Sequence, residues 1–247
     1  PAGGRCGSRL AVTNDAVTAQ DIETFWRDGV VCLRGVLPLE LVASMADPVE
    51  AALRSSATAN LSEMAEQLSA AGVAGRLVDE SVAARSVPRG HFLAGTDHWR
   101  EQPEFLVFAT RSPLPGLVAR LLISQHLWFY EDSVLVKEPG SQERTAFHQD
   151  MAYFHLSGHL VATTWVPLDP VNAETGAVRY VIGSHRDRTR YLPNTFVTDL
   201  SIGSNGVAVP DYDAVGHLGA AHIVSFDTEP GDVIVHHACT IHGASGN

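Results

Sequence analysis

The chain has 247 residues, of which 45% are hydrophobic and 18% charged, a composition typical of a globular protein and unlike that of a disordered chain. Its formal net charge of −11 argues against nucleic acid and against an anionic membrane surface as partners. The three cysteines are scattered, so we expect neither a disulfide framework nor a cysteine zinc site. These features favour a cytoplasmic protein. The chain also begins without Met, so we expect a longer gene product.

Residues up to about 125 have mostly helical patterns. Thr18, with Asp21 three residues later, predicts a capped helix start, and Gly29 predicts its end. A short apolar strand is expected over residues 30–33. Apolar residues at helical spacing predict further helices. These span residues 39–53, 61–68 and 112–122.

Residues beyond about 125 have the patterns of short strands and turns. We expect strands over residues 127–130, 133–137, 160–168, 177–182, 223–226 and 233–237, separated by turns rich in Pro and Gly. Many short strands favour a β-sandwich or barrel over alternating strand–helix units. Residues 193–219 form a long loop, and loops of this length are usually functional or mobile.

Two histidines and one aspartate have the spacing of a metal site. If their segment is extended, His148 and Asp150 project from one face, and His242 follows the strand 233–237. Two imidazoles and one carboxylate form the facial triad of non-haem Fe(II) oxygenases. His148 could instead be a core histidine bonded to Asp150. The competing histidines are His155, His159, His236 and His237. Cys239 reads as an inert buried thiol rather than a nucleophile.

The chain also resembles the phytanoyl-CoA dioxygenase family of Fe(II)/2-oxoglutarate-dependent oxygenases. The resemblance rests on several short blocks in the family's order over nearly the whole chain. They are FWRDGVVCLRGVL at 25–37, FHQD at 147–150 with Tyr153 after it, WVPLD at 165–169, TGAVR at 175–179, GSH at 183–185, GDVIVHH at 231–237 and TIHG at 240–243. Each block alone is weak evidence; together they are strong.

The resemblance implies a mainly β fold with bracing helices, a double-stranded β-helix (jelly roll, cupin-like) in a single domain over residues 1–247. It implies Fe(II), 2-oxoglutarate and O₂ as the cofactor and co-substrates. His148, Asp150 and His242 would be the metal ligands and the catalytic centre. Gln149, Lys137 and Trp165 would contact 2-oxoglutarate. Trp165 could equally well be a packed core residue. Lys137 could equally well lie at a solvent-exposed strand end.

The implied reaction oxidises a C–H bond of a small-molecule substrate, with release of succinate and CO₂. Related halogenases have a small residue at the position of Asp150, so its carboxylate favours hydroxylation or a similar oxidation. We expect a small, largely apolar metabolite, with Tyr153 facing it and residues 193–219 and 85–100 as candidate lids. Two alternatives stay open: a non-catalytic jelly-roll metal-binding protein, and a zinc-dependent hydrolase, although the chain lacks H-E-x-x-H.

One expected family feature falls outside the sequence. The far carboxylate of 2-oxoglutarate needs a cation, and the family usually places an Arg further beyond its second histidine than this chain extends, since it stops at Asn247. We expect a longer natural chain to supply that Arg. Otherwise a cation of this chain would serve, Lys137 first and Arg179 second.

Overall fold

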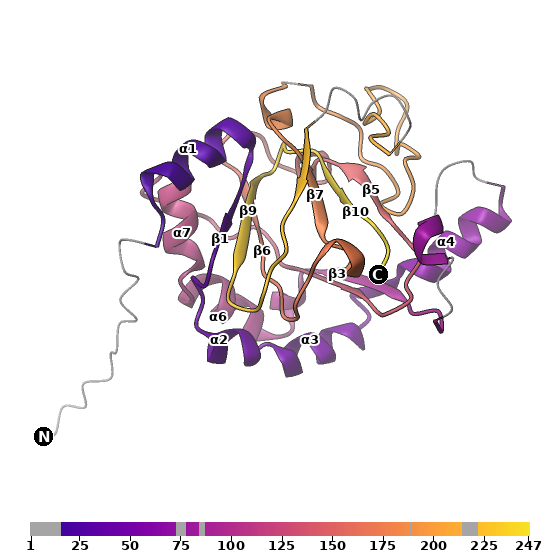
Figure 1. Ribbon diagram of the computed structural model, residues 1–247, viewed down its shortest axis with the longest axis horizontal. Coiled ribbons are helices and arrows are strands. Elements are labelled where there is room, and N and C mark those ends of the chain that lie inside the picture. Colours follow the sequence, from indigo (N-terminus) through magenta and orange to yellow (C-terminus); the bar gives the residue numbers. More distant parts are fainter. Residues whose placement is uncertain (1–15, 73–77, 84–86, 188, 214–221) are drawn as a thin grey trace, which may run out of the picture.

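The computed structural model describes residues 16–72, 78–83, 87–187, 189–213 and 222–247 (Figure 1). Its α-helices are α1 (Ala19–Asp28), α2 (Leu39–Ala43), α3 (Ala46–Leu53), α4 (Leu61–Ala70), α5 (Glu80–Ala83), α6 (Pro103–Arg111) and α7 (Leu114–Leu121). Its short 3-10 helices are η1 (His98–Arg100), η2 (Asp150–Ala152), η3 (Ala173–Thr175) and η4 (Ser184–Arg186). None of the helices in these ranges is long and apolar enough to cross a membrane.

The strands of the described residues form three antiparallel sheets. Their bounds are β1 (Val30–Leu33), β2 (Thr58–Asn60), β3 (Phe92–Thr96), β4 (Ser133–Lys137), β5 (Thr145–His148), β6 (Ala162–Trp165), β7 (Val178–Val181), β8 (Ile223–Ser225), β9 (Val233–His237) and β10 (His242–Ala244). The sheets have the strand orders β1-β9-β6, β5-β10-β7-β8 and β2-β3-β4.

The first two sheets pack face to face around an apolar core. Val30 and Ile234 of one sheet contact Tyr180 of the other, and Trp165 and Val224 pack around them. The outer face of β1-β9-β6 is covered by α1 and α7, as Figure 1 shows, with Phe25 and Leu117 buried against it. Two such sheets braced by helices form the jelly roll, so the predicted fold class is confirmed.

Helix α1 begins and ends at the predicted residues. Thr18 accepts a hydrogen bond from the backbone N–H of Asp21, and the Asp21 carboxylate accepts one from the backbone N–H of Thr18, which completes the capping box. Gly29 ends the helix in the left-handed conformation, with a φ of 84°. This tight end lets β1 start one residue later.

The helix predicted over residues 39–53 is wrong as one element, because the chain breaks it between α2 and α3 at Ser44 and Met45. Pro48 explains the break. Proline has no backbone N–H and clashes with the preceding turn of a helix, so it is tolerated only in a helix's first turn. The restart at Ala46 places Pro48 there.

The strand predicted over residues 127–130 is also wrong, since these residues have no strand partner in the ranges given above and Trp128 is 93% exposed. The predicted strands over 133–137 and 233–237 are confirmed as β4 and β9. The lid expected at 85–100 is also wrong over residues 87–100. These residues contain β3, the central strand of the third sheet, and Phe92 in it is fully buried. Residues 85 and 86 lie outside the described residues.

The segment predicted as a long loop has no helix or strand over its described part, residues 193–213. Its first residues are buried rather than free to move, with Asn194, Val197 and Thr198 almost inaccessible. Asn194 donates a hydrogen bond to the carbonyl of Phe147 in β5. The start of the loop is therefore part of the wall beside β5; residues 214–219 lie outside the described residues.

Candidate active site

The three residues predicted as metal ligands converge on one point. His148 ends β5 and His242 begins β10, and the two are directly paired across these neighbouring strands. Gln149 is extended, with φ −112° and ψ 133°, so Asp150 projects from the same face as His148. One potential ligand atom from each of the three residues lies within 4.8 Å of the others. Strand pairing therefore brings together residues that are far apart in the sequence.

Backbone carbonyls fix how the two imidazoles are presented. The Nδ1 of His148 lies 2.8 Å from the carbonyl of Ala146, and the Nδ1 of His242 lies 3.0 Å from that of Thr240. Because a carbonyl only accepts, each Nδ1 carries the proton and each Nε2 presents its lone pair. Both Nε2 atoms face Asp150 Oδ1, at 3.5 Å and 3.4 Å. Histidines that bind metals usually have this outer hydrogen bond, so the donor set fits a divalent metal.

The ionisation of the three residues suits a cation. Burial tends to raise the pKa of Asp150, but the surrounding histidines, His242 foremost, hold this pKa well below its ordinary value. Burial and the charge of His242 lower the pKa of His148. Burial opposes the charged form of His242, yet the Asp150 carboxylate raises its pKa. The site thus holds a buried anion that needs a positive partner.

The facing sheet supplies two further contacts to Asp150 that sequence reasoning missed. Thr163 of β6 donates a hydrogen bond to Asp150 Oδ2 at 2.7 Å, and His236 of β9 approaches the same oxygen through Nε2 at 2.8 Å. Burial and the charge of His242 lower the pKa of His236 to about 4, so its imidazole is neutral. His236 is one of the competing histidines of the sequence, and no sequence pattern marks Thr163.

The competing histidines do not join the metal cluster within the described residues. His237 lies on β9 next to His236, and its Nε2 donates to the carbonyl of His159. Its Nδ1 accepts a hydrogen bond from the backbone N–H of Cys239. Burial raises the pKa of the Cys239 thiol, which agrees with an inert cysteine.

The residues expected to contact 2-oxoglutarate lie at three different places. Gln149 is buried and donates a hydrogen bond to the carbonyl of Cys239. Trp165 packs between the two sheets, in the cluster of Tyr180 and Ile234. Lys137 donates to the carbonyl of Ser245 at 2.5 Å, and burial together with the charge of Arg179 lowers its pKa to about 7. For all three, contact with 2-oxoglutarate stays a prediction.

Neighbouring residues of β7 point to opposite sides of its sheet. Arg179 lies over the ring of Phe147 and forms an ion pair with Asp213, on the side away from the facing sheet. Tyr180 lies between the sheets, with its ring stacked on His242 at 5.8 Å between centroids. Its buried hydroxyl has no hydrogen-bond partner among the described residues, so it can donate to a bound group.

Aromatic side chains surround the start of η2. Tyr153 packs its ring edge-on against His148, and its hydroxyl donates to Asn194. The ring of Phe154 packs at a tilt against that of Tyr130, whose hydroxyl accepts a hydrogen bond from the backbone N–H of His155. The N–H of Phe154 also donates to the carbonyl of Asp150, so Tyr130 packs against residues that directly follow a predicted metal ligand.

Glu131 follows this aromatic segment and was also missed. Burial raises its pKa, and the charges of Asp97 and Asp150 raise it further. Its carboxylate therefore lies near enough to Asp150 for the two charges to interact. Glu131 lies just before β4, and no sequence pattern indicates that it is close to Asp150.

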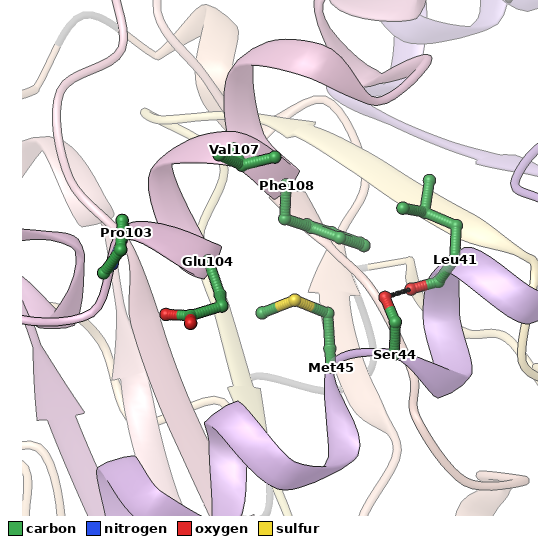
Figure 2. Close-up of a pocket in the computed structure, with 7 residues that line it drawn as sticks. All are labelled: Leu41, Ser44, Met45, Pro103, Glu104, Val107 and Phe108. Atoms are coloured by element: carbon green, nitrogen blue, oxygen red, sulfur yellow. Dashed lines mark hydrogen bonds between the residues drawn. The ribbon is translucent and has the colours of Figure 1, made fainter.

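An apolar pocket of about 330 Å³ lies elsewhere in the molecule, between α2, α3 and α6 (Figure 2). Met45 and Phe108 face each other across it, with Leu41 and Val107 at its edges. None of the residues predicted for the site lines this pocket. The metal cluster and the pocket are therefore separate features.

A jelly roll that presents two imidazoles and one carboxylate from neighbouring strands has the architecture of a non-haem iron oxygenase. The model of the phytanoyl-CoA dioxygenase (PhyH) family matches residues 25–247. The chain belongs to this family and is a non-haem Fe(II)- and 2-oxoglutarate-dependent dioxygenase.

Solved structures have the same fold. The non-heme alpha ketoglutarate dependent carbocyclase SnoK from nogalamycin biosynthesis is 22% identical, with a TM-score of 0.64, over 95% of this chain and 79% of SnoK. The epimerase SnoN, in complex with Fe³⁺, alpha ketoglutarate and nogalamycin RO, is 23% identical, with a TM-score of 0.64, over 92% of this chain and 77% of SnoN. EctD from S. alaskensis, with 2-oxoglutarate and 5-hydroxyectoine, is 19% identical, with a TM-score of 0.63, over 95% of this chain and 73% of EctD. At these identities the likeness shows the fold.

Proposed function

We propose that His148, Asp150 and His242 hold the catalytic Fe(II). The observation that carries this proposal is their convergence, with both Nε2 lone pairs and Asp150 Oδ1 facing one another within 4.8 Å. Three protein ligands on one side of the metal leave open positions for 2-oxoglutarate and O₂. The residues supply geometry and a partly buried surrounding, and they decide which C–H bond of the substrate lies close.

The reaction is the oxidation, most simply the hydroxylation, of a C–H bond in a small, largely apolar metabolite. When bound, iron and 2-oxoglutarate supply the oxidising chemistry, and 2-oxoglutarate leaves as succinate and CO₂. Asp150 supports hydroxylation because its carboxylate fills the position that a small residue leaves open in related halogenases.

The apolar character of the substrate is supported by an exposed aromatic segment, residues 128–130, which Tyr130 connects to the residues after Asp150. Trp128 is 93% exposed, and Phe129 and Tyr130 are more than one-third exposed. Large exposed aromatic side chains grouped beside a site commonly bind ligands. Phe154 joins this group to η2 through the packing of its ring against Tyr130. Aromatic faces of this kind bind an apolar or ring-containing molecule better than a highly charged one.

The co-substrate would lie between the two sheets, beside His242. Tyr180 offers it a buried hydroxyl that has no other hydrogen-bond partner in the described ranges, and Trp165 lines the same space. Lys137 is the first candidate within this chain for binding the far carboxylate. Arg179, the second candidate, is disfavoured because Asp213 already pairs with it on the other side of its sheet.

A turnover assay tests the proposal. The purified protein is incubated with Fe(II), 2-oxoglutarate and pools of apolar metabolites, and succinate and oxidised products are measured by mass spectrometry. His148→Ala, Asp150→Ala and His242→Ala should each abolish iron-dependent turnover. His237→Ala is the matched control, because this buried histidine bonds only to backbone groups in the described structure; it should lower stability and keep iron affinity. Normal turnover by His242→Ala would refute the assignment.

We further propose that the substrate is a small molecule and that the protein works in the cytoplasm. The support for this compartment is chemical: Cys32 and Cys239 are unpaired thiols, as expected where thiols stay reduced. The third cysteine, Cys6, lies outside the described residues.

A further inference from the structure

The two oxygens of Asp150 have separate surroundings. Oδ1 faces the two imidazoles that are proposed to bind the metal, His148 and His242. Oδ2 faces the other sheet and accepts hydrogen bonds from Thr163 at 2.7 Å and from His236 at 2.8 Å. Thr163 and His236 are directly paired on the neighbouring strands β6 and β9. One register pair therefore supplies both donors.

The hydrogen bond from His236 has one possible direction. A carboxylate can only accept, so Nε2 of His236 carries the proton of this hydrogen bond, and Nδ1 lies at the other side of the ring. This Nδ1 is buried and has no partner among the described residues. With Nε2 turned to Asp150, the ring contributes a directed N–H rather than a lone pair. His236 is therefore placed to orient a ligand and not to act as one.

On this basis, and resting on the proposed iron site, we propose that His236 is a positioning residue that, with Thr163, holds Asp150 as a ligand through Oδ1 alone. The consequence is the number of open coordination positions. An octahedral ion with two imidazoles and one carboxylate oxygen keeps three positions, enough for two-point binding of 2-oxoglutarate and for O₂. A carboxylate that rotated to bind through both oxygens would occupy one of the three. The two donors oppose that rotation because it would break both of their hydrogen bonds.

Binding of Fe(II) and 2-oxoglutarate under anaerobic conditions, measured by calorimetry, tests this role without turnover. In His236→Phe the ring is kept and the donor is lost. We expect Fe(II) affinity, or 2-oxoglutarate affinity of the Fe(II)-loaded protein, to fall about 10- to 100-fold, the usual effect of removing a hydrogen bond to a metal ligand. His236→Gln restores an N–H at the position of Nε2 and should recover most of the loss. Thr163→Val, which is nearly isosteric, should weaken the same affinities.

His237→Gln is the matched control, because it changes the neighbouring buried histidine of β9, which does not contact Asp150. It should keep both affinities, whatever its effect on thermal stability. The inference is overturned if His236→Phe and Thr163→Val both bind Fe(II) and 2-oxoglutarate as tightly as the unmodified protein, or if His236→Gln is as impaired as His236→Phe. An unmodified protein that bound no Fe(II) would instead refute the proposed iron site, and the inference with it.

Discussion

Gly243 connects the packing of the sheet to the position of a metal ligand. It follows His242 in β10, at a point where the register with β5 is irregular. A Cβ added here would lie 2.8 Å from the carbonyl oxygen of Thr145 and 3.2 Å from the backbone nitrogen of Phe147. Both atoms belong to the backbone of β5, so no side-chain rotation can relieve the contact. The Gly243→Ala variant must therefore move β10 away from β5.

The magnitude follows from opposing effects. Overpacking of this kind costs about 1–3 kcal/mol, and replacing a strand glycine returns about 0.5–1 kcal/mol of backbone entropy. We expect the free energy of unfolding in urea to fall by about 1–2 kcal/mol. Because His242 moves with its strand relative to His148, Fe(II) affinity should fall about tenfold.

Gly35→Ala separates these two effects. Gly35 has a φ of 59° and open space around it, so a side chain there only strains the backbone, by about 1–2 kcal/mol. This control should lose similar stability and keep its Fe(II) affinity. Unchanged urea unfolding and unchanged Fe(II) binding in Gly243→Ala would refute the reasoning.

Three further variants probe other parts of the molecule. Asp232 accepts hydrogen bonds from the backbone N–H groups of Gly35 and Glu229, and its pKa lies below the ordinary value. Asp232→Ala should therefore lower the free energy of unfolding by about 2–3 kcal/mol at pH 7. This difference from the unmodified protein should shrink as the pH falls through the lowered pKa. Tyr180→Phe removes a hydroxyl without a partner in the described ranges, so urea unfolding should show equal or higher stability, while binding assays should show about tenfold weaker affinity for 2-oxoglutarate. Lys137 has a pKa of about 7 in the folded protein. Between pH 7 and the ordinary pKa of lysine the unfolded chain therefore binds more protons than the folded one, so stability should rise with pH over that range. Lys137→Met should lose this pH dependence of the free energy of unfolding.

Local patterns predicted the parts of the fold that are decided locally. The capping box at Thr18 and the left-handed Gly29 defined α1 to the residue, since both ends depend on neighbours within a few positions. The same logic applied to Pro48 would have predicted the break between α2 and α3. The prediction of a strand at 127–130 was wrong. Aromatic residues are common in strands, but a segment becomes a strand only when it pairs with another strand.

The candidate site divides in the same way. The triad could be predicted because its residues lie within recognisable short blocks around His148 and His242. The donors to Asp150 Oδ2 could not, because Thr163 and His236 meet only through the register of β6 and β9 and the packing of one sheet on the other. No local spacing encodes which residues of two distant strands face each other.

The pairing of β1 with β9 has a consequence for how the protein is made. Val30 is opposite His236, so the first strand of the sheet waits for a partner about 200 residues further along the chain (Figure 1). At about 5–20 residues per second, a ribosome needs roughly 10–40 s to synthesise that interval. During this time the apolar segment Val30–Leu33 emerges without its partner, open to non-native pairing and to capture by chaperones. The jelly roll can close only after β9 has been synthesised, so folding of the first strand depends on a distant part of the chain.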